Sequence, residues 1–347
     1  MELKNTEHSQ ILKFKELLAD KQQKIVIVSH RNPDGDAIGS SFALYNYFIK
    51  AGHLVDVIIP NNYPQFLNWV PNVKNTLVYE WHAEKCNHLL KSCDILIAVD
   101  FNDLSRIREF ESQIEPDNCY KVLLDHHPDP GSFADLVISD TSVSSASELV
   151  YLFLKEIDSV NLMDKEIAEC IYCGIMTDTG CFSFNSSKRQ TFEIVGELLD
   201  FGINKDYIFS QVYNNYSADR MKLMGHCLHE KMTYIPEMNT AFIALSQEDI
   251  KNYNFKVGDS EGFVNIPLSI RGVKMSGLFT EKSDIVKISL RSKGNFAVNE
   301  IVNKYFAGGG HKNAAGGESK LSLDDTIAKF ISILDEYKDQ LSDDDSQ

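Results

Sequence analysis

The chain has 347 residues, of which 43% are hydrophobic and 24% are charged, a composition typical of a globular protein with room for two domains. Its formal net charge is −16 and it has no basic block, which excludes the broad basic face of proteins that bind long nucleic acids. No apolar run approaches the roughly 20 residues that span a bilayer, and residues 1–10 are polar. We therefore expect a cytoplasmic protein without a membrane partner, and any anionic substrate to be small.

The first part of the chain alternates short apolar runs with helical patterns. The predicted strands are Ile25–Val28, Val55–Ile59, Ile95–Val99 and Val122–Leu124. The predicted helices cover residues 7–20, 37–50, 145–157, 164–177 and 188–200, and the third begins with the capping-box pattern Ser145-Ala146-Ser147-Glu148. Fully apolar strands alternating with helices predict an α/β fold, with a mostly parallel sheet sandwiched between helices.

The pattern changes after about residue 205. Residues 206–228 have the pattern of one connecting helix. Alternating runs at 232–235, 241–245, 273–280 and 285–290 predict strands of a second sheet, with helices near 296–305 and 323–338. We therefore predict a first domain over residues 1–205, a linker helix over 206–230, a smaller C-terminal α/β domain over 231–340 and an acidic tail over 341–347.

Acidic and imidazole side chains follow the predicted strands of the first domain. The groups are His30, Asp34 and Asp36 after the first strand, Asp100 after the third, Asp125-His126-His127 after the fourth, and Asp178 after a predicted helix. The carboxyl ends of parallel strands meet at one edge of a sheet, so we expect these groups to converge there. Taken alone, Asp34-Gly35-Asp36 is typical of a turn, Asp100 of a helix N-cap and Asp178 of a surface turn. Their joint occurrence favours a metal site.

Carboxylates with histidines are ligands that Mn²⁺ and Mg²⁺ accept, and a pair of such ions needs a bridging carboxylate. Asp100, alone at its strand end, suits the bridge and is one of two candidate catalytic residues. The remaining ligand candidates are His30 and Asp34 for one ion, and Asp36, His126 and Asp178 for the other. A hydroxide bridging the ions would attack phosphorus, while His127, the second catalytic candidate, would bond a phosphoryl oxygen or protonate the departing oxygen. The pattern predicts a two-metal hydrolase.

The second domain contains a glycine-rich segment, Gly308 to Gly317, which begins Gly308-Gly309-Gly310-His311-Lys312. Glycines let a backbone approach a phosphate closely, and exposed N–H groups in such a loop form an anion-binding nest. The segment lacks the Gly-Lys-Ser/Thr of a Walker loop, and a helical stretch precedes it, unlike a dinucleotide-binding fingerprint. A flexible turn is the plain alternative, but the histidine and lysine favour an anion site, to which Arg291 could add a guanidinium.

These motifs resemble those of a known family. His30 to Ser41, Val99-Asp100, Asp125-His126-His127 and Asp178-Thr179-Gly180 resemble the four motifs of the DHH phosphoesterases, and Gly308 to Gly317 resembles the glycine-histidine signature of the DHH-associated C-terminal domain. The resemblance covers nearly the whole chain. It implies two Mn²⁺ ions, with Mg²⁺ as the alternative, held by His30, Asp34 and Asp100 and by Asp36, Asp100, His126 and Asp178. It also implies that His127 acts on the substrate and that Arg106, Arg291 and His311 contact it.

Within that family the chain most resembles the stand-alone oligoribonucleases (nanoRNases) that are also pAp phosphatases. The resemblance implies an exonuclease that hydrolyses very short RNA to mononucleotides and 3′-phosphoadenosine 5′-phosphate (pAp) to AMP, with the two domains closing over the substrate. A cyclic di-AMP phosphodiesterase is the nearest alternative. A DNA exonuclease would need a basic channel, an inorganic pyrophosphatase would lack the glycine-histidine segment, and a nucleotide sensor would not need an intact His127. The sequence leaves a homodimer open.

Overall fold

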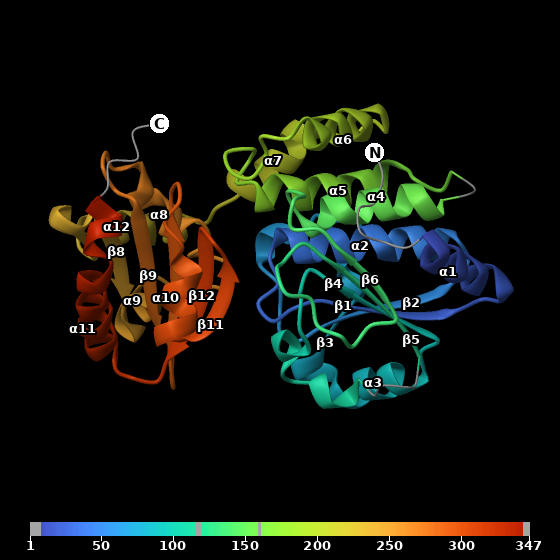
Figure 1. The fold of residues 1–347 in the computed structure, drawn as a ribbon, viewed down its shortest axis with the longest axis horizontal. Coiled ribbons are helices and arrows are strands. Elements are labelled where there is room, and N and C mark those ends of the chain that lie inside the picture. Colours follow the sequence, from blue (N-terminus) through green and yellow to red (C-terminus); the bar gives the residue numbers. More distant parts are fainter. Residues whose placement is uncertain (1–7, 115–118, 159–160, 343–347) are drawn as a thin grey trace. The chain divides into compact units, whose positions relative to one another are not determined.

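The computed structural model of the chain describes residues 8–114, 119–158 and 161–342. The described chain divides into two compact units between Asn215 and Tyr216. The first unit is a parallel sheet with helices on both faces, and the second is a smaller mixed sheet with helices (Figure 1). The α/β fold class expected from the sequence is confirmed. No helix within these described ranges combines the length and the apolar character that a membrane crossing requires.

The sheet of the first unit has the strand order β3-β2-β1-β4-β5-β6, and each neighbouring pair is parallel. Its strands are β1 (Lys24–Val28), β2 (Leu54–Ile59), β3 (Thr76–Val78), β4 (Ile95–Val99), β5 (Tyr120–Asp125) and β6 (Leu136–Ser139). The order reverses between β1 and β4. From this point the chain continues to β2 on one side and to β5 on the other. Open α/β sheets bind ligands outside the carboxyl ends of the strands at such a switch point.

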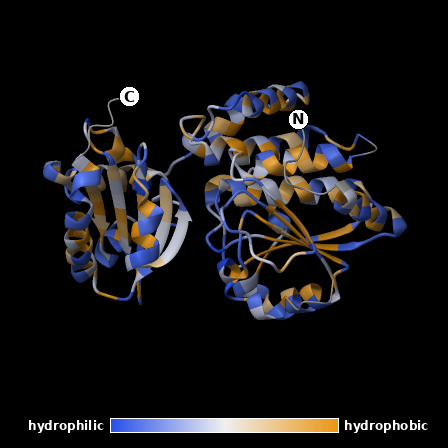
Figure 2. Cartoon of the chain, in the orientation of Figure 1, coloured by the Kyte–Doolittle hydropathy of each residue, from blue (hydrophilic) through white to orange (hydrophobic). Residues whose placement is uncertain are grey.

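Helices cover both faces of this sheet. On one face lie α1 (His8–Asp20), α2 (Gly35–Lys50), α4 (Ala146–Ile157) and α5 (Lys165–Asp178), and on the other lies α3 (Tyr79–Ser92) (Figure 1). Outside α5 pack α6 (Arg189–Asp200) and α7 (Lys205–Tyr213). The strands are apolar on both sides because both sides are covered: Ile97 faces the α2 layer and Leu96 faces α3. Figure 2 shows these strands as orange arrows between helices of mixed colour.

Some elements differ from the prediction. The strands β3 and β6 and the helix α3 were not predicted: the two strands are short and end the sheet, and α3 buries only Cys86 and Leu90 of its described side chains. The stretch 206–228, predicted as one helix, forms two, α7 and α8 (Ala218–His229). Ser217 ends the continuity because its side chain accepts the Arg220 N–H at 3.0 Å and so caps a new helix.

The sheet of the second unit has the order β11-β12-β10-β9-β8-β7; β8 and β9 are parallel, and the other neighbours are antiparallel. Its strands are β7 (Met232–Ile235), β8 (Thr240–Leu245), β9 (Met275–Glu281), β10 (Val286–Ser292), β11 (Ala307–His311) and β12 (Ala314–Ser319). Its helices are α8, α9 (Gln247–Asn252), α10 (Val298–Tyr305), α11 (Leu323–Leu334) and α12 (Lys338–Ser342). α10 and α11 cover one face, and α8 covers the β7–β9 end of the other. Residues 343–347 of the predicted acidic tail lie outside the described residues.

The glycine-rich segment is a hairpin of β11 and β12, not the loop with exposed amides predicted from the sequence. Gly308 pairs with Gly317, and Gly309 pairs with Gly316. A Cβ at Gly308 would lie 2.0 Å from the Gly316 carbonyl oxygen, so the two strands can pair only when residue 308 is glycine. The prediction was wrong because glycine is depleted in strands, and a run of glycines is therefore typical of a loop.

Replacing Gly308 by alanine is expected to destabilise the second unit by about 2 kcal/mol or more, because the new methyl group would collide with backbone. Denaturant unfolding measures this loss. Gly316→Ala is the matched control: a Cβ there would meet the Ile288 carbonyl oxygen at 3.6 Å, an ordinary contact, so the change should stay below about 1 kcal/mol. Equal losses in the two variants would contradict the hairpin.

Candidate metal centre

The loop after β1 carries the first candidate ligands. His30 lies two residues beyond β1, and Asp34 is the N-cap of α2, where its Oδ1 accepts the Asp36 N–H at 3.0 Å. Gly35 begins α2 in close contact with α5: a Cβ there would lie 2.4 Å from Oγ1 of Thr177. Asp36 therefore sits on the first turn of a helix whose start is fixed by an aspartate cap and a glycine.

Asp100 directly follows β4 and has a left-handed backbone, with φ at 64°. Its N–H donates to the carbonyl of Leu124 on the neighbouring strand β5 at 3.0 Å, which keeps the residue at the sheet edge. Left-handed backbone is unfavourable for most residues, and aspartate and asparagine tolerate it best. Strain of this kind is typical of functional positions.

One group of candidate ligands consists of His30, Asp34 and Asp100, whose ligand atoms lie within 4.8 Å of one another. Nε2 of His30 is 3.4 Å from Oδ2 of Asp100. The other ring nitrogen, Nδ1, lies 2.9 Å from the Arg31 carbonyl oxygen, which accepts a hydrogen bond and so assigns the proton to Nδ1. His30 therefore directs the lone pair of Nε2 toward the carboxylates, as a metal-binding histidine does.

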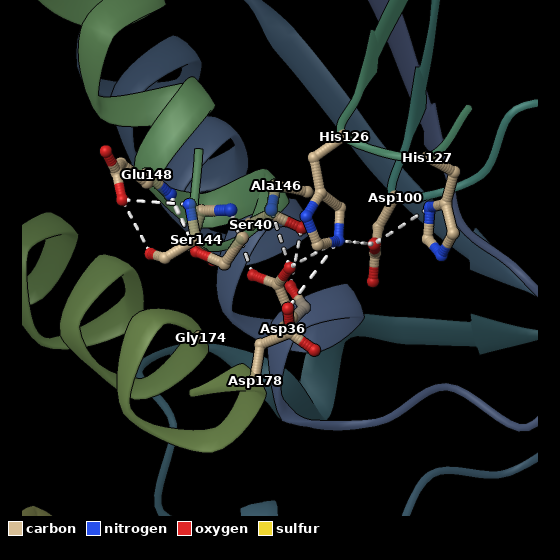
Figure 3. A network of polar contacts seen from close by, with 12 residues as sticks. Asp36, Ser40, Asp100, His126, His127, Ser144, Ala146, Glu148, Gly174 and Asp178 are labelled. Carbon is tan, nitrogen blue, oxygen red and sulfur yellow. Dashed lines mark hydrogen bonds and ion pairs between the residues drawn. The ribbon is translucent and has the colours of Figure 1, made fainter. Parts of the chain in front are cut away.

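A second group consists of Asp36, His126 and Asp178, again with ligand atoms within 4.8 Å of one another. Nε2 of His126 lies 3.9 Å from Oδ2 of Asp36 and 3.6 Å from Oδ2 of Asp178, the last residue of α5 (Figure 3). The His126 ring also donates a hydrogen bond to the carbonyl of Val143. This bond orients the ring with Nε2 toward the two carboxylates.

Asp100 lies between the two groups. Its Oδ2 faces His30 at 3.4 Å, and its Oδ1 faces Nε2 of His126 at 3.6 Å. One oxygen of a single carboxylate thus points to each group, which is the arrangement that a bridging ligand needs. The structure brings the predicted metal-ligand candidates together at the predicted edge; that they bind metal stays a prediction.

The charges in this cluster suit cations. Burial, reinforced by Asp36 and the other nearby carboxylates, raises the pKa of Asp100 well above its ordinary value. Burial likewise raises the pKa of Asp36 to about 7. Burial lowers the pKa of His30 and of His126, so both imidazoles are neutral and can act as ligands. Buried carboxylates that repel one another beside neutral histidines form a donor set that divalent cations would neutralise.

His127 is held by the neighbouring Asp125, a residue to which the sequence prediction gave no role. Nδ1 of His127 lies 2.7 Å from Oδ1 of Asp125, and the His127 N–H donates to Oδ2 at 3.1 Å. Asp125 is fully buried, so the ring orientation is set by a rigid partner. Burial lowers the pKa of His127 to about 2, with the charges of His126 and Arg106 acting in the same direction. The only sequence signal for this role of Asp125 was its place at the start of Asp-His-His.

Arg106 lies close to the same cluster. It belongs to the short 3-10 turn Leu104–Ile107, and its carbonyl accepts the Arg31 N–H at 3.0 Å, which ties this turn to the loop that carries His30. Its positive charge helps to lower the pKa of His30, although burial is the larger cause. Arg106 is thus placed where it can contact an anion bound at the cluster.

The candidate substrate residues of the second unit share one face of its sheet. Arg291 on β10 and His311 on β11 both pair with Ala314 on the intervening strand β12, so all three side chains point to the same side. The three glycines before His311 are not placed beside these two side chains: a Cβ at Gly309 would lie 3.3 Å from Oδ1 of Asn303 on α10, and a Cβ at Gly308 or Gly310 would meet the backbone of β12.

Comparisons with known proteins agree with this architecture. Residues 24–175 match the DHH family, N-terminal domain, and residues 240–340 match the DHHA1 domain. A probable bifunctional oligoribonuclease and PAP phosphatase NrnA from Streptococcus mutans is 30% identical over 333 residues, covering 94% of this chain and 99% of the relative. The bifunctional oligoribonuclease and PAP phosphatase NrnA of Bacillus subtilis is 27% identical over 296 residues, covering 84% of this chain and 88% of the relative.

Solved structures share the fold. The crystal structure of an exopolyphosphatase-related protein from Bacteroides fragilis is 41% identical and has a TM-score of 0.92, covering 98% of this chain and 99% of that one. The RecJ structure from Thermus thermophilus has a TM-score of 0.57 at 13% identity, covering 97% of this chain and 55% of that one, and it shows a common fold only. The chain therefore belongs to the DHH family of phosphoesterases, with an N-terminal DHH domain followed by a DHHA1 domain.

Proposed function

We propose that the protein hydrolyses short oligoribonucleotides to mononucleotides and pAp to AMP, with two divalent cations as cofactors. The observation that carries this proposal is the convergence of both ligand groups on Asp100 beside His127. The relatives named NrnA are bifunctional oligoribonucleases and PAP phosphatases, which supports the same substrates here. The net charge of −16 supports short substrates, because long strands need an extended basic surface.

The ligand groups fit two Mn²⁺ ions, with Mg²⁺ as the alternative. His30, Asp34 and Asp100 would hold one ion, and Asp36, Asp100, His126 and Asp178 the other. Oxygen-rich sites that include histidine suit Mn²⁺ better than Mg²⁺. Such ions, when bound, supply a water molecule with a lowered pKa and neutralise charge on the phosphoryl oxygens.

The other residues of the site would bind and orient the scissile phosphate. His127 is held by Asp125 through both its ring and its backbone, with Nε2 turned away from Asp125. Because Nδ1 carries the proton shared with Asp125, Nε2 would take up a proton before donating it to a phosphoryl oxygen or to the departing oxygen. Arg106 would neutralise a phosphate at the same edge. In the DHHA1 domain, Arg291 and His311 would hold a second phosphate or a base at the sheet face that they share.

Turnover of a substrate panel in the presence of Mn²⁺ tests this function. The panel contains ribodinucleotides, pAp, cyclic di-AMP, inorganic polyphosphate and a single-stranded RNA of about 24 nucleotides. We expect the highest kcat/KM for dinucleotides and pAp, because a small substrate needs only the few local cations that the chain offers. Faster cleavage of the long strand would contradict the short-substrate proposal. Preferential turnover of cyclic di-AMP or polyphosphate would support a phosphoesterase activity but would contradict the proposed substrates.

A further inference from the structure

The first turn of α4 supports a ligand of the second group. Asp36 accepts the N–H groups of Ala146 and Ser147 at 2.6 and 2.9 Å (Figure 3). Gly174 on α5 closes the site from the other side: a Cβ there would lie 1.8 Å from Oγ of Ser147 and 2.6 Å from Oδ1 of Asp36. Asp36 is thus held between α4 and α5 without room to shift, and its position depends on where α4 begins.

The position of His126, the histidine of this group, depends on the same segment. The His126 ring donates to the carbonyl of Val143, which lies directly before Ser144 and the N-cap Ser145 of α4. The segment 143–147 therefore contacts Asp36 through its amides and His126 through a carbonyl. Whatever fixes this segment also fixes the spacing between the two ligands.

Glu148 fixes that segment. Its side chain is fully buried, and within the described residues its carboxylate accepts four hydrogen bonds. Two come from Ser144, from the N–H at 3.1 Å and from the hydroxyl at 2.6 Å. The others come from α6, from Gln190 at 3.2 Å and Thr191 at 2.9 Å. A buried carboxylate satisfied in this way is rigid, and it clamps α4, α6 and the loop before α4 together.

The clamp differs from the capping box that the sequence predicted. Oγ of Ser145 accepts the Glu148 N–H at 3.0 Å, as in a capping box. In a capping box the Glu148 carboxylate would also accept the Ser145 N–H. Here it accepts the N–H of the preceding residue, Ser144, instead. Capping α4 does not require a bond to Ser144, but this bond fixes the residue next to Val143 and so the acceptor of the His126 ring.

We propose that Glu148 is a positioning residue of the second metal site, which holds the 143–147 segment so that Asp36 and His126 present their ligand atoms at the spacing a divalent cation requires. The inference rests on the proposed function, because it assumes a cation at this group. Hydrogen-bond partners behind metal ligands commonly change metal affinity about 10- to 100-fold when they are removed.

Direct Mn²⁺ binding tests this role. Free Mn²⁺, measured by electron paramagnetic resonance during titration of the metal-free full-length protein, gives the number of sites and their Kd values. For Glu148→Ala we expect one site weakened about 10- to 100-fold and the other close to wild type. The reason is that the hydrogen bonds of His30 and Asp34 within the described residues join them to Arg31 and to the first turn of α2, not to Glu148 or the 143–147 segment. Half-maximal activity should require correspondingly more Mn²⁺, with kcat recovering at saturation.

Two variants separate positioning from general loss of structure. Leu152→Ala removes core packing from the same helix without touching the network, and it should lower stability while leaving both Kd values unchanged. Glu148→Gln keeps an acceptor for Ser144 but loses the charge, and it should weaken one site at least about threefold even if Glu148→Ala does not fold. Wild-type Kd values in Glu148→Gln and in folded Glu148→Ala, or an equal loss of affinity in Leu152→Ala, would overturn the inference. Absence of Mn²⁺ binding in the wild type would instead overturn the proposed function.

Discussion

Asp100→Asn is expected to abolish hydrolysis while making the metal-free protein more stable. The carboxylate is almost fully buried, and burial with four neighbouring aspartates raises the pKa of Asp100, so its charge opposes folding when no cation is bound. Asparagine tolerates the left-handed backbone of residue 100, so the local fold should persist. We therefore expect the variant to melt at a higher temperature than the metal-free wild type. Each kcal/mol added to the free energy of unfolding should raise the melting temperature by about 2–4 °C.

The same substitution removes the only candidate ligand common to both groups. Activity should fall by at least about a thousandfold, equivalent to about 4 kcal/mol of transition-state stabilisation. The rise in melting temperature that Mn²⁺ gives the wild type should be largely lost. Calorimetry with and without Mn²⁺, together with a dinucleotide assay, measures these effects.

Asp94→Asn is the matched control at the opposite end of β4. The Asp94 carboxylate accepts the Lys24 N–H at 2.8 Å, and this bond is the main reason why the pKa of Asp94 is lowered. Asparagine there should cost a small amount of stability and leave activity unchanged. If Asp100→Asn melts below the metal-free wild type or keeps its response to Mn²⁺, Asp100 is not the shared ligand.

His127→Ala is expected to lower kcat by about 10²- to 10⁴-fold while both Mn²⁺ sites remain. The reason is that His127 is held by Asp125 and belongs to neither proposed ligand group. His126→Ala should behave differently, losing Mn²⁺ affinity because its Nε2 faces Asp36, Asp100 and Asp178. Titration of Mn²⁺ and steady-state kinetics on each variant separate the two roles.

The alternative for His127 is that it binds metal. Asp100, Asp125 and His127 also bring their ligand atoms within 4.8 Å of one another. A loss of Mn²⁺ affinity in His127→Ala as large as that in His126→Ala would make His127 a ligand. His229→Ala, at an exposed position of the second unit, serves as the control and should leave kcat and Mn²⁺ binding unchanged.

The first domain could be predicted from the sequence where the apolar strands and the candidate ligands lie next to each other in the chain. The apolar cores of strands β1, β4 and β5 end two residues before His30 and directly before Asp100 and Asp125, so the strand pattern also located the site. The role of Glu148 was not readable. A capping-box pattern predicts a local bond to Ser145, whereas the bonds to Ser144 and to α6 depend on how α4 packs in the folded domain.

The structure of the second unit was harder to predict, because its glycine-rich strands have the composition of a loop. A run of glycines is typical of a turn, and the strand pairing of Gly308 with Gly317 depends on the close approach of two backbones, which the sequence does not display. The division between helices at Ser217 was missed for a different reason: Asn214-Asn215 and the capping Ser217 interrupt the helical pattern, but the prediction continued one helix across them. In the hairpin a contact between two backbones determined the structure, and side-chain periodicity carried no sign of it.

The candidate ligands come from residues as far apart as His30 and Asp178, and α2, α4 and α5 meet at them. Cations bound there would therefore crosslink most of the first domain. Their binding free energy would add to the free energy of unfolding, and their removal would increase transient opening and expose the backbone to proteases. Manganese starvation is accordingly expected to shorten the lifetime of the protein as well as to silence it, so that its abundance would follow the supply of the metal.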